Sequence, residues 1–93
     1  MLFTRRLIIH GNVQGVGYRY SMVKFSRANL VTGWVKNRSN GTVEAVIQGA
    51  EENVEKVIRW AHQGPASANV TRVETMEETN ALIYSDFTQQ STE

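Results

Sequence analysis

The stretch Gly11-Asn12-Val13-Gln14-Gly15-Val16-Gly17-Tyr18-Arg19 contains three glycines within seven residues and ends on an arginine. It follows the mostly apolar run of residues 7–10, which is typical of a β-strand, and it precedes a segment that lacks glycine and proline. Glycine allows positive φ and the close approach of another group to the main chain. A strand, a glycine loop and a helix start can therefore aim several N–H groups at one anion, and the adjacent arginine favours a phosphate.

The first half of the chain predicts three strands and one helix. A strand is expected over residues 4–10, a helix with apolar side chains at helical spacing over about 20–29, and a second strand over 31–38. Asn40-Gly41 is typical of a two-residue type I′ turn, so the third strand, 43–47, is expected to form a hairpin with the second. Apolar and polar residues alternate in this third strand, which predicts one buried face.

The second half predicts another helix and two more strands. Gly49 is expected to cap the start of the helix, an apolar stripe follows, and Gly64-Pro65 ends it. Strands are expected over residues 70–76 and 81–88, and the polar tail 89–93 is expected to fray.

The order of these elements is β-α-β-β-α-β with an extra short strand near the end. It predicts a ferredoxin-like α/β (α+β) sandwich, in which two helices cover one face of a mainly antiparallel sheet, in a single domain over residues 1–93. The first helix returns the chain, so the first two strands run parallel and end at the same edge of the sheet. Ligands in open α/β sheets bind at such carboxyl ends. Arg19 and Asn37 are therefore expected to face one pocket.

Composition excludes several kinds of chemistry. The chain has no cysteine, so disulfides, thiolate catalysis and cysteine-held metal clusters are excluded, and two histidines make a dedicated transition-metal site improbable. The net charge of +1 does not indicate nucleic acid or an acidic membrane as a partner. The apolar run near the N-terminus is too short for a signal peptide or a membrane span, so a soluble, cytoplasmic protein is expected.

Several motifs, the glycine loop among them, agree in register, and together they resemble the acylphosphatase family over residues 7 to 87. They are the runs Gly11 to Arg19, Gly33-Trp34-Val35-Lys36-Asn37, Asn40-Gly41-Thr42-Val43-Glu44, Gln48-Gly49, and Gly64-Pro65 followed by Val70-x-x-Val73-Glu74. The resemblance implies a ferredoxin-like fold, which matches the pattern of elements. It also implies a metal-independent enzyme that hydrolyses the carboxyl–phosphate anhydride of small acyl phosphates to a carboxylate and inorganic phosphate, with no cofactor.

The resemblance assigns roles to residues of two segments. Arg19 would bind the phosphate, and Asn37 would orient the attacking water. The main chain of the loop would cradle the phosphoryl oxygens, through Gln14, Gly15, Val16, Gly17, Tyr18 and Arg19. Inorganic phosphate is expected to be a competitor as well as the product, and the protein is expected to be a monomer that binds neither nucleic acid nor membrane.

The proposed reaction asks little of the protein. An acyl phosphate expels a carboxylate whose conjugate acid has a pKa of about 4, so no general acid is needed at neutral pH. Phosphoryl transfer through a loose transition state needs positioning and charge stabilisation, which an amide, loop N–H groups and an arginine can supply. Because the motif holds no obvious base, we hypothesise that the substrate phosphate takes the proton from water.

Two other functions fit a fold of this class. One is a phosphate-binding module without turnover, and the other is an RNA-recognition module. The second predicts a basic sheet face with clustered aromatic side chains, and the third predicted strand has no aromatic residue.

The chain departs from the family pattern at three places. Tyr18 stands where phenylalanine is commoner, so its hydroxyl needs a partner. Asn29-Leu30 replaces an apolar residue followed by glycine, and because leucine tolerates positive φ poorly, Asn29 is expected to take the left-handed position. Gln89-Gln90 replaces an apolar strand end, which leaves the length of the last strand open.

Overall fold

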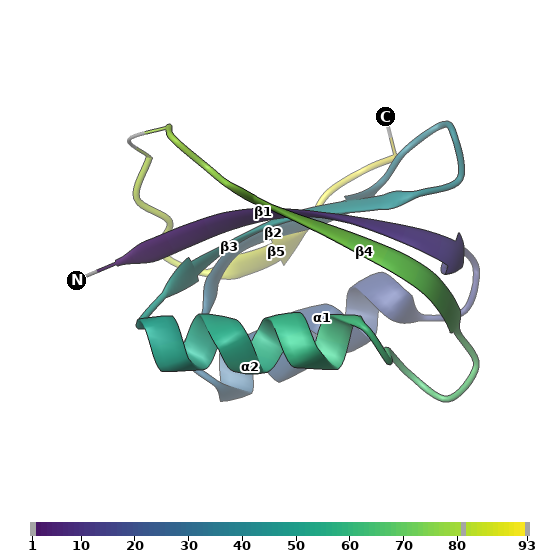
Figure 1. The fold of residues 1–93 in the computed structure, drawn as a ribbon, viewed down its shortest axis with the longest axis horizontal. Helices are drawn as coiled ribbons and strands as arrows, with labels where there is room; N and C mark the ends of the chain where they lie inside the picture. The colour runs from purple at the N-terminus through teal and green to yellow at the C-terminus, as the bar shows by residue number, and fades with distance from the viewer. Residues whose placement is uncertain (1, 81, 93) are drawn as a thin grey trace.

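Five strands form one sheet, and both helices lie on the same face of it (Figure 1). The computed structural model describes residues 2–80 and 82–92. Its elements, in chain order, are β1 (Phe3–Asn12), α1 (Tyr18–Ala28), β2 (Thr32–Asn37), β3 (Val43–Gly49), α2 (Glu51–Ala61), β4 (Asn69–Glu77) and β5 (Phe87–Gln89). The ferredoxin-like arrangement predicted from the sequence is confirmed.

The strand order places β3 between β1 and β2. The sheet runs β4-β1-β3-β2-β5, and β3 is antiparallel to both of its neighbours. The strands β1 and β2 are therefore parallel, as predicted, and their carboxyl ends lie at one edge of the sheet. At the margins, β4 pairs antiparallel with β1, and β5 pairs parallel with β2.

The hydrophobic core fills the space between the sheet and the helices. From the sheet it takes side chains such as Leu7, Ile9, Val35, Val43, Ala45 and Ile47, and from the helices Tyr18, Met22, Val54, Val57 and Ala61. On α2 the apolar residues recur every three or four positions, so they form one stripe that faces the sheet. Burying a large apolar side chain contributes about 1.5–3 kcal/mol, so this layer supplies most of the favourable free energy of folding.

The prediction of one buried face for the third strand is wrong, because both faces of β3 are buried. Its polar residues lie on the face away from the helices, where side chains from β1 and β2 cover them. Glu44 is 6% exposed and forms ion pairs with three cations of neighbouring segments, Arg6, Lys36 and Arg38. Arg6 also lies over the ring of Trp34, with 5.7 Å between the guanidinium carbon and the ring centroid.

The hairpin between β2 and β3 does not contain the predicted type I′ turn. That turn needs positive φ at both central residues, but only Gly41 of the pair has it, with φ of 92°. The N–H of Gly41 donates to the carbonyl of Arg38 at 3.1 Å, and the N–H of Arg38 donates to the carbonyl of Thr42 at 2.8 Å. This is a three-residue loop, and the side chain of Asn40 stabilises it by accepting the N–H and hydroxyl of Thr42 at 3.1 and 2.7 Å.

The helix boundaries differ from the prediction at three ends. The first helix begins at Tyr18 rather than near residue 20, and the second follows Ala50, since Gly49 is the last residue of β3. At the end of α1, Leu30 takes the left-handed conformation with φ of 59°, whereas Asn29 has φ of −108°. The prediction for Asn29 is therefore wrong.

Hydrogen bonds explain why Leu30 accepts this conformation. The N–H of Val31 donates to the carbonyl of Ser26 at 2.9 Å, and the N–H of Leu30 donates to that of Arg27 at 3.3 Å. These are the two bonds of a Schellman motif, which requires positive φ at the residue after the cap. Asn29 instead donates its side-chain amide to the carbonyl of Phe25 at 2.9 Å. Leu30 is 78% exposed, so its side chain offsets little of the strain.

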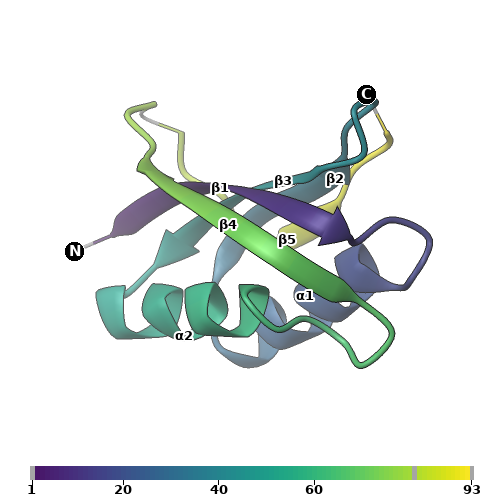
Figure 2. The ribbon, with the colours of Figure 1, turned by 45° about the vertical axis from the view of Figure 1, so that its right-hand side comes forward.

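The last strand is shorter and lies further along than predicted. Of the expected strand 81–88, residue 81 lies outside the described residues, and β5 covers only Phe87–Gln89. The prediction that the tail frays from Gln89 is wrong for its first two residues. Gln89 belongs to β5, and the N–H of Gln90 donates to the carbonyl of Val35 at 2.8 Å. Figures 1 and 2 show the C-terminal segment beside the β2–β3 hairpin.

Replacing Leu30 by glycine is expected to stabilise the protein by about 1 kcal/mol, because glycine takes the left-handed conformation without a Cβ penalty. Urea unfolding measures the change. Leu30→Ala is the matched control, since it removes the exposed side chain and keeps the Cβ, and its free energy of unfolding is expected to stay near that of the wild type. Equal stabilisation by both substitutions would contradict the explanation from backbone strain.

Candidate active site

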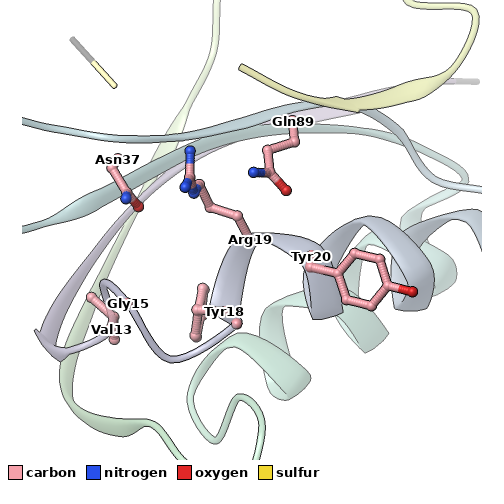
Figure 3. A pocket seen from close by; sticks show the side chains of 8 residues that line it. Val13, Gly15, Tyr18, Arg19, Tyr20, Asn37 and Gln89 are labelled. Atoms are coloured by element: carbon pink, nitrogen blue, oxygen red, sulfur yellow. The ribbon is translucent and has the colours of Figure 1, made fainter. Parts of the chain in front are cut away.

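A small cavity lies at the edge of the sheet where β1 and β2 end (Figure 3). Its volume is about 110 Å³. The residues that line it come from the glycine loop, the start of α1, the end of β2 and β5: Val13, Gly15, Gly17, Tyr18, Arg19, Tyr20, Asn37 and Gln89. The structure thus brings together Arg19 and Asn37, which the sequence predicted would share one pocket.

The floor of the cavity is the glycine loop. Gly15 and Gly17 both have positive φ, of 74° and 80°, and Gly17 is the N-cap of α1. A Cβ at either position would meet no atom within 4 Å, so it is the backbone conformation and not lack of space that favours glycine here. The first backbone N–H groups of a helix have no partner within it. In this loop they belong to residues that line the cavity.

The electrostatics of the cavity favour an anion. The N-terminus of α1 contributes the positive end of the helix dipole, and its first turn contains no acidic residue. Arg19 adds a full positive charge, and none of the eight lining residues carries a carboxylate. This combination of helix start, loop N–H groups and arginine is the arrangement that binds phosphate in many proteins.

The side chain of Arg19 is held by the C-terminal segment. One guanidinium nitrogen, Nη1, donates to the carbonyl of Gln90 at 3.1 Å. Figure 3 shows the guanidinium between the side chains of Asn37 and Gln89. Because a guanidinium has five N–H donors, the contact with Gln90 orients Arg19 and leaves donors for a ligand.

Asn37 presents an acceptor that has no protein partner within the described residues. It ends β2, is 8% exposed, and its amide oxygen Oδ1 is buried without a hydrogen bond. Figure 3 shows the side chain pointing from β2 toward the glycine loop. An unsatisfied buried acceptor costs about 1–3 kcal/mol, so a hydrogen-bond donor bound beside this oxygen would be stabilised there.

Three residues of the predicted cradle also make contacts outside the cavity. The side chain of Gln14 reaches the β2–β3 hairpin, and the carbonyl of Val16 accepts the hydroxyl of Ser67 at 2.7 Å. Neither Gln14 nor Val16 lines the cavity. The hydroxyl of Tyr18 donates to the carbonyl of Ala61 at 2.8 Å. This carbonyl is the partner that the tyrosine hydroxyl was expected to need. Burial raises the pKa of the Tyr18 phenol well above its ordinary value.

Sequence reasoning missed the contributions of β5 and of Tyr20. Gln89 lines the cavity and Gln90 holds Arg19, although the polar composition of residues 89–93 predicts a frayed tail. A polar glutamine side chain does not indicate in the sequence that either residue belongs to the site. Gln90 moreover acts through its backbone carbonyl. His10 does not line the cavity, and its Nε2 lies 2.6 Å from a carboxylate oxygen of Glu74.

A family model described as Acylphosphatase matches residues 5–89. The chain belongs to the acylphosphatase family. An acylphosphatase of Thermococcus kodakarensis is 60% identical over 68 residues, which cover 73% of this chain and 75% of that protein. One of Bordetella avium is 42% identical over 83 residues, which cover 89% and 88%. The solved structure of an acylphosphatase from Coxiella burnetii has a TM-score of 0.90 at 35% identity and covers 96% of this chain and 93% of that one.

The predictions of an acylphosphatase and of its enzymatic activity are thereby confirmed, and a binding module without turnover is not favoured. The enzymes of this family act on small-molecule acyl phosphates. No helix within the described residues is long and apolar enough to cross a membrane. Over the same residues no three His, Asp or Glu side chains form a cluster that could hold a metal ion.

The buried phenol of Tyr18 predicts a loss of stability at alkaline pH. Above about pH 10 the phenol ionises in the unfolded chain, while in the folded protein its raised pKa keeps it protonated. The unfolded state then binds fewer protons, so this contribution is complete below pH 10 and is lost as pH rises, by up to about 1.4 kcal/mol per pH unit. Urea unfolding between pH 7 and 11 measures it.

Tyr18→Phe is expected to unfold more easily at pH 7, by about 1 kcal/mol, because the carbonyl of Ala61 loses its donor. The difference from the wild type should shrink above pH 10. Tyr20→Phe is the control, since it removes a hydroxyl from a side chain that is 62% exposed and leaves Tyr18 in place. A difference between wild type and Tyr18→Phe that does not change up to pH 11 would contradict this account.

Proposed function

We propose that this acylphosphatase hydrolyses its substrate by direct attack of water on the phosphoryl group, with Arg19 and Asn37 as the catalytic residues. Arg19 and the main chain of Gln14 to Arg19 bind the phosphoryl oxygens, and Asn37 orients the water. The observation that carries the proposal is the buried Oδ1 of Asn37, which lacks a partner within the described residues and belongs to the same cavity as Arg19.

The cradle accounts for most of the charge stabilisation. In a loose transition state, negative charge spreads over the three equatorial phosphoryl oxygens. The N–H groups at the start of α1 and the guanidinium of Arg19 are fixed before substrate arrives, so they need not reorganise as charge develops. Since the carboxylate leaving group is stable at neutral pH, no acid has to protonate it.

Asn37 contributes to the reaction by positioning the attacking water. Its Oδ1 accepts a hydrogen bond from the attacking water, which directs a lone pair of that water toward phosphorus. Holding two reactants in line converts a bimolecular step into one that is effectively unimolecular. The amide is a poor base, so it orients the water and does not take its proton.

The proton of the water passes to the substrate. None of the residues that line the cavity is Asp, Glu or His, and His10 is engaged with Glu74 elsewhere. The phosphoryl oxygens are bonded to the phosphorus that the water attacks. One of them therefore receives the proton as the new P–O bond forms. The products are a carboxylate and inorganic phosphate.

We expect Arg19→Ala and Asn37→Ala to lose activity in different ways. With benzoyl phosphate as substrate, Asn37→Ala should lower kcat by about 10²–10³-fold, because only the alignment of water is lost. Arg19→Ala should lower kcat/KM by at least about 10³-fold and also weaken binding. Arg19→Lys is expected to recover little, since an ammonium cannot reproduce the planar fork.

The assay should be run with and without EDTA, and we expect the same rate in both. Full kcat in Asn37→Ala would rule out its proposed role. A wild-type protein that binds phosphate but releases none from benzoyl phosphate would instead be a binding module. A rate that depends on an ionised protein group in the pH profile would contradict proton transfer to the substrate.

Inorganic phosphate is expected to compete with substrate and to stabilise the fold. At a concentration 100 times its Kd, it should raise the free energy of unfolding by about 2.7 kcal/mol. The stabilisation should vanish in Arg19→Ala and persist in Asn37→Ala, because only the first variant damages the cradle. Thermal unfolding across a phosphate titration measures both. Loss of stabilisation in Asn37→Ala alone would reverse the assigned roles.

We also propose that the chain acts as a single domain and as a monomer, because residues of one chain provide all of the cavity lining described above. Sedimentation velocity at assay concentrations tests the monomer. A cytoplasmic location is proposed as well, since a chain without cysteine needs no oxidising compartment to fold. Fractionation of the source cells tests it.

A further inference from the structure

We propose that Gln89 is a specificity-determining residue, which favours acyl phosphates whose acyl group carries an N–H or O–H donor close to its carbonyl over those with a hydrocarbon acyl group. The inference rests on the function proposed above. It concerns the half of the substrate that neither the phosphate cradle nor Asn37 binds.

The cavity is too small to enclose a whole substrate. Its volume is about 110 Å³, whereas pockets that enclose a whole small ligand measure about 300–1,000 Å³. The phosphoryl group and the attacking water occupy it in the proposed reaction, so the acyl group lies at its mouth. The exposed residues of the lining are Gly15, Gly17, Tyr20 and Gln89. Because glycine has no side chain, Tyr20 and Gln89 supply the side chains of the mouth.

The position of Asn37 sets the side on which the acyl group leaves. In phosphoryl transfer the attacking and leaving oxygens lie roughly in line, on opposite sides of the phosphorus. Figure 3 shows Asn37 and Gln89 on opposite sides of the guanidinium of Arg19. If Asn37 holds the water and Arg19 holds the phosphoryl oxygens, the acyl group lies on the side of Gln89.

The sheet holds Gln89 in this place. Residues two apart in a strand point to the same face, and Phe87 is buried in the core between the sheet and the helices. The side chain of Gln89 therefore leaves the sheet on the helix side, and Figure 3 shows its amide directed toward the start of α1. Its main chain pairs with Val35, and the carbonyl of the next residue accepts the hydrogen bond from Arg19. The point from which the amide extends is thus fixed before substrate binds.

The amide of Gln89 offers both a donor and an acceptor to the acyl group. Its Nε2 and Oε1 form no hydrogen bond with another described residue. The hydroxyl of Tyr20 points away from the other labelled side chains in Figure 3, so it does not share this task. Every acyl phosphate presents a carbonyl to Nε2, but only an acyl group with an N–H or O–H presents a donor to Oε1. The acceptor Oε1 therefore discriminates between the two classes of substrate.

The discrimination is expected to be modest because Gln89 is exposed. A buried polar site rejects a substrate that lacks its hydrogen-bonding group by about 10⁴-fold or more, whereas at an exposed site water replaces the missing partner. One net hydrogen bond to solvent-exposed groups corresponds to about 3–10-fold in kcat/KM. Since glutamine at this position departs from the family pattern, the preference is expected to belong to this protein and not to the family as a whole.

Carbamoyl phosphate and acetyl phosphate are the matched substrates for the test, since they differ only in an amino group that replaces a methyl group. Gln89→Met keeps nearly the same side-chain length and removes the amide. In this variant the ratio of kcat/KM for carbamoyl phosphate to that for acetyl phosphate is expected to fall by about 3–10-fold relative to the wild type. Comparing ratios cancels the different intrinsic reactivities of the two substrates and any general damage to the cradle.

Two further variants separate the loss of the amide from other effects. Gln89→Leu also lacks the donor and the acceptor but has a different shape, so it should show the same fall in the ratio. Gln63→Met is the matched control, since Gln63 is exposed and lies outside the cavity, and its ratio should equal that of the wild type.

A second pair of substrates tests the O–H donor. Glycoloyl phosphate and propionyl phosphate differ only in a hydroxyl group that replaces a methyl group. Their ratio of kcat/KM is expected to fall in Gln89→Met in the same direction as that of the first pair. A fall for the first pair without one for the second would overturn the part of the proposal that concerns O–H donors.

Inorganic phosphate as a competitive inhibitor shows which half of the substrate Gln89 contacts. Its inhibition constant should change by less than about 2-fold in Gln89→Met, because phosphate has no acyl group. A rise as large as the fall in kcat/KM would place Gln89 in the cradle and overturn its role in specificity. An unchanged carbamoyl-to-acetyl ratio in both Gln89 variants would also overturn that role, and would leave the proposed hydrolysis standing. A wild-type protein that hydrolyses none of these substrates would overturn the proposed function itself.

Discussion

The antiparallel pairing of β3 with both β1 and β2 is the constraint on which the rest of this structure depends. Because one strand separates them, β1 and β2 run parallel and end at the same edge, one followed by the glycine loop and the other ending on Asn37. The same pairing leaves a face for α1 and α2 to cover and buries the central strand on both sides. A site built from residues eighteen apart in sequence thus follows from strand order.

The site depends on backbone geometry more than on reactive side chains. Positive φ at Gly15 and Gly17 leads the chain into a helix start whose N–H groups belong to the cavity wall, and the carbonyl of Gln90 orients Arg19. Against this, Asn37 retains a buried oxygen without a partner in the described part of the chain. Such an oxygen lowers stability, and the fold tolerates it where a ligand or water completes the hydrogen bond. If Asn37 binds the attacking water as proposed, this small loss of stability accompanies an acceptor that is already in place before the water arrives.

The order of elements and the convergence of Arg19 and Asn37 could be predicted because both follow from local patterns. Hydrophobic period marks the strands and helices, and strand direction then places their ends. The end of α1 could not be predicted in this way. Leucine disfavours a φ of 59°, but the hydrogen bonds donated by the N–H groups of Val31 and Leu30 hold Leu30 in that conformation. The position of β5 could not be predicted either. Gln89 reaches the site because its strand pairs with β2, and Gln90 reaches it through the backbone carbonyl that accepts a hydrogen bond from Arg19. Polar side chains give no signal for either contact.

Glu44 has a further consequence for how the chain folds. Side chains of a strand alternate between faces, so a shift of β3 by one residue would turn Glu44, Val46 and Gln48 toward the helices. Such a shift would separate the carboxylate of Glu44 from Arg6, Lys36 and Arg38 and bury it among apolar side chains. The cost of a buried unpaired charge far exceeds that of a lost surface ion pair. Glu44 therefore discriminates against misaligned sheets, in which the loop and Asn37 would no longer meet.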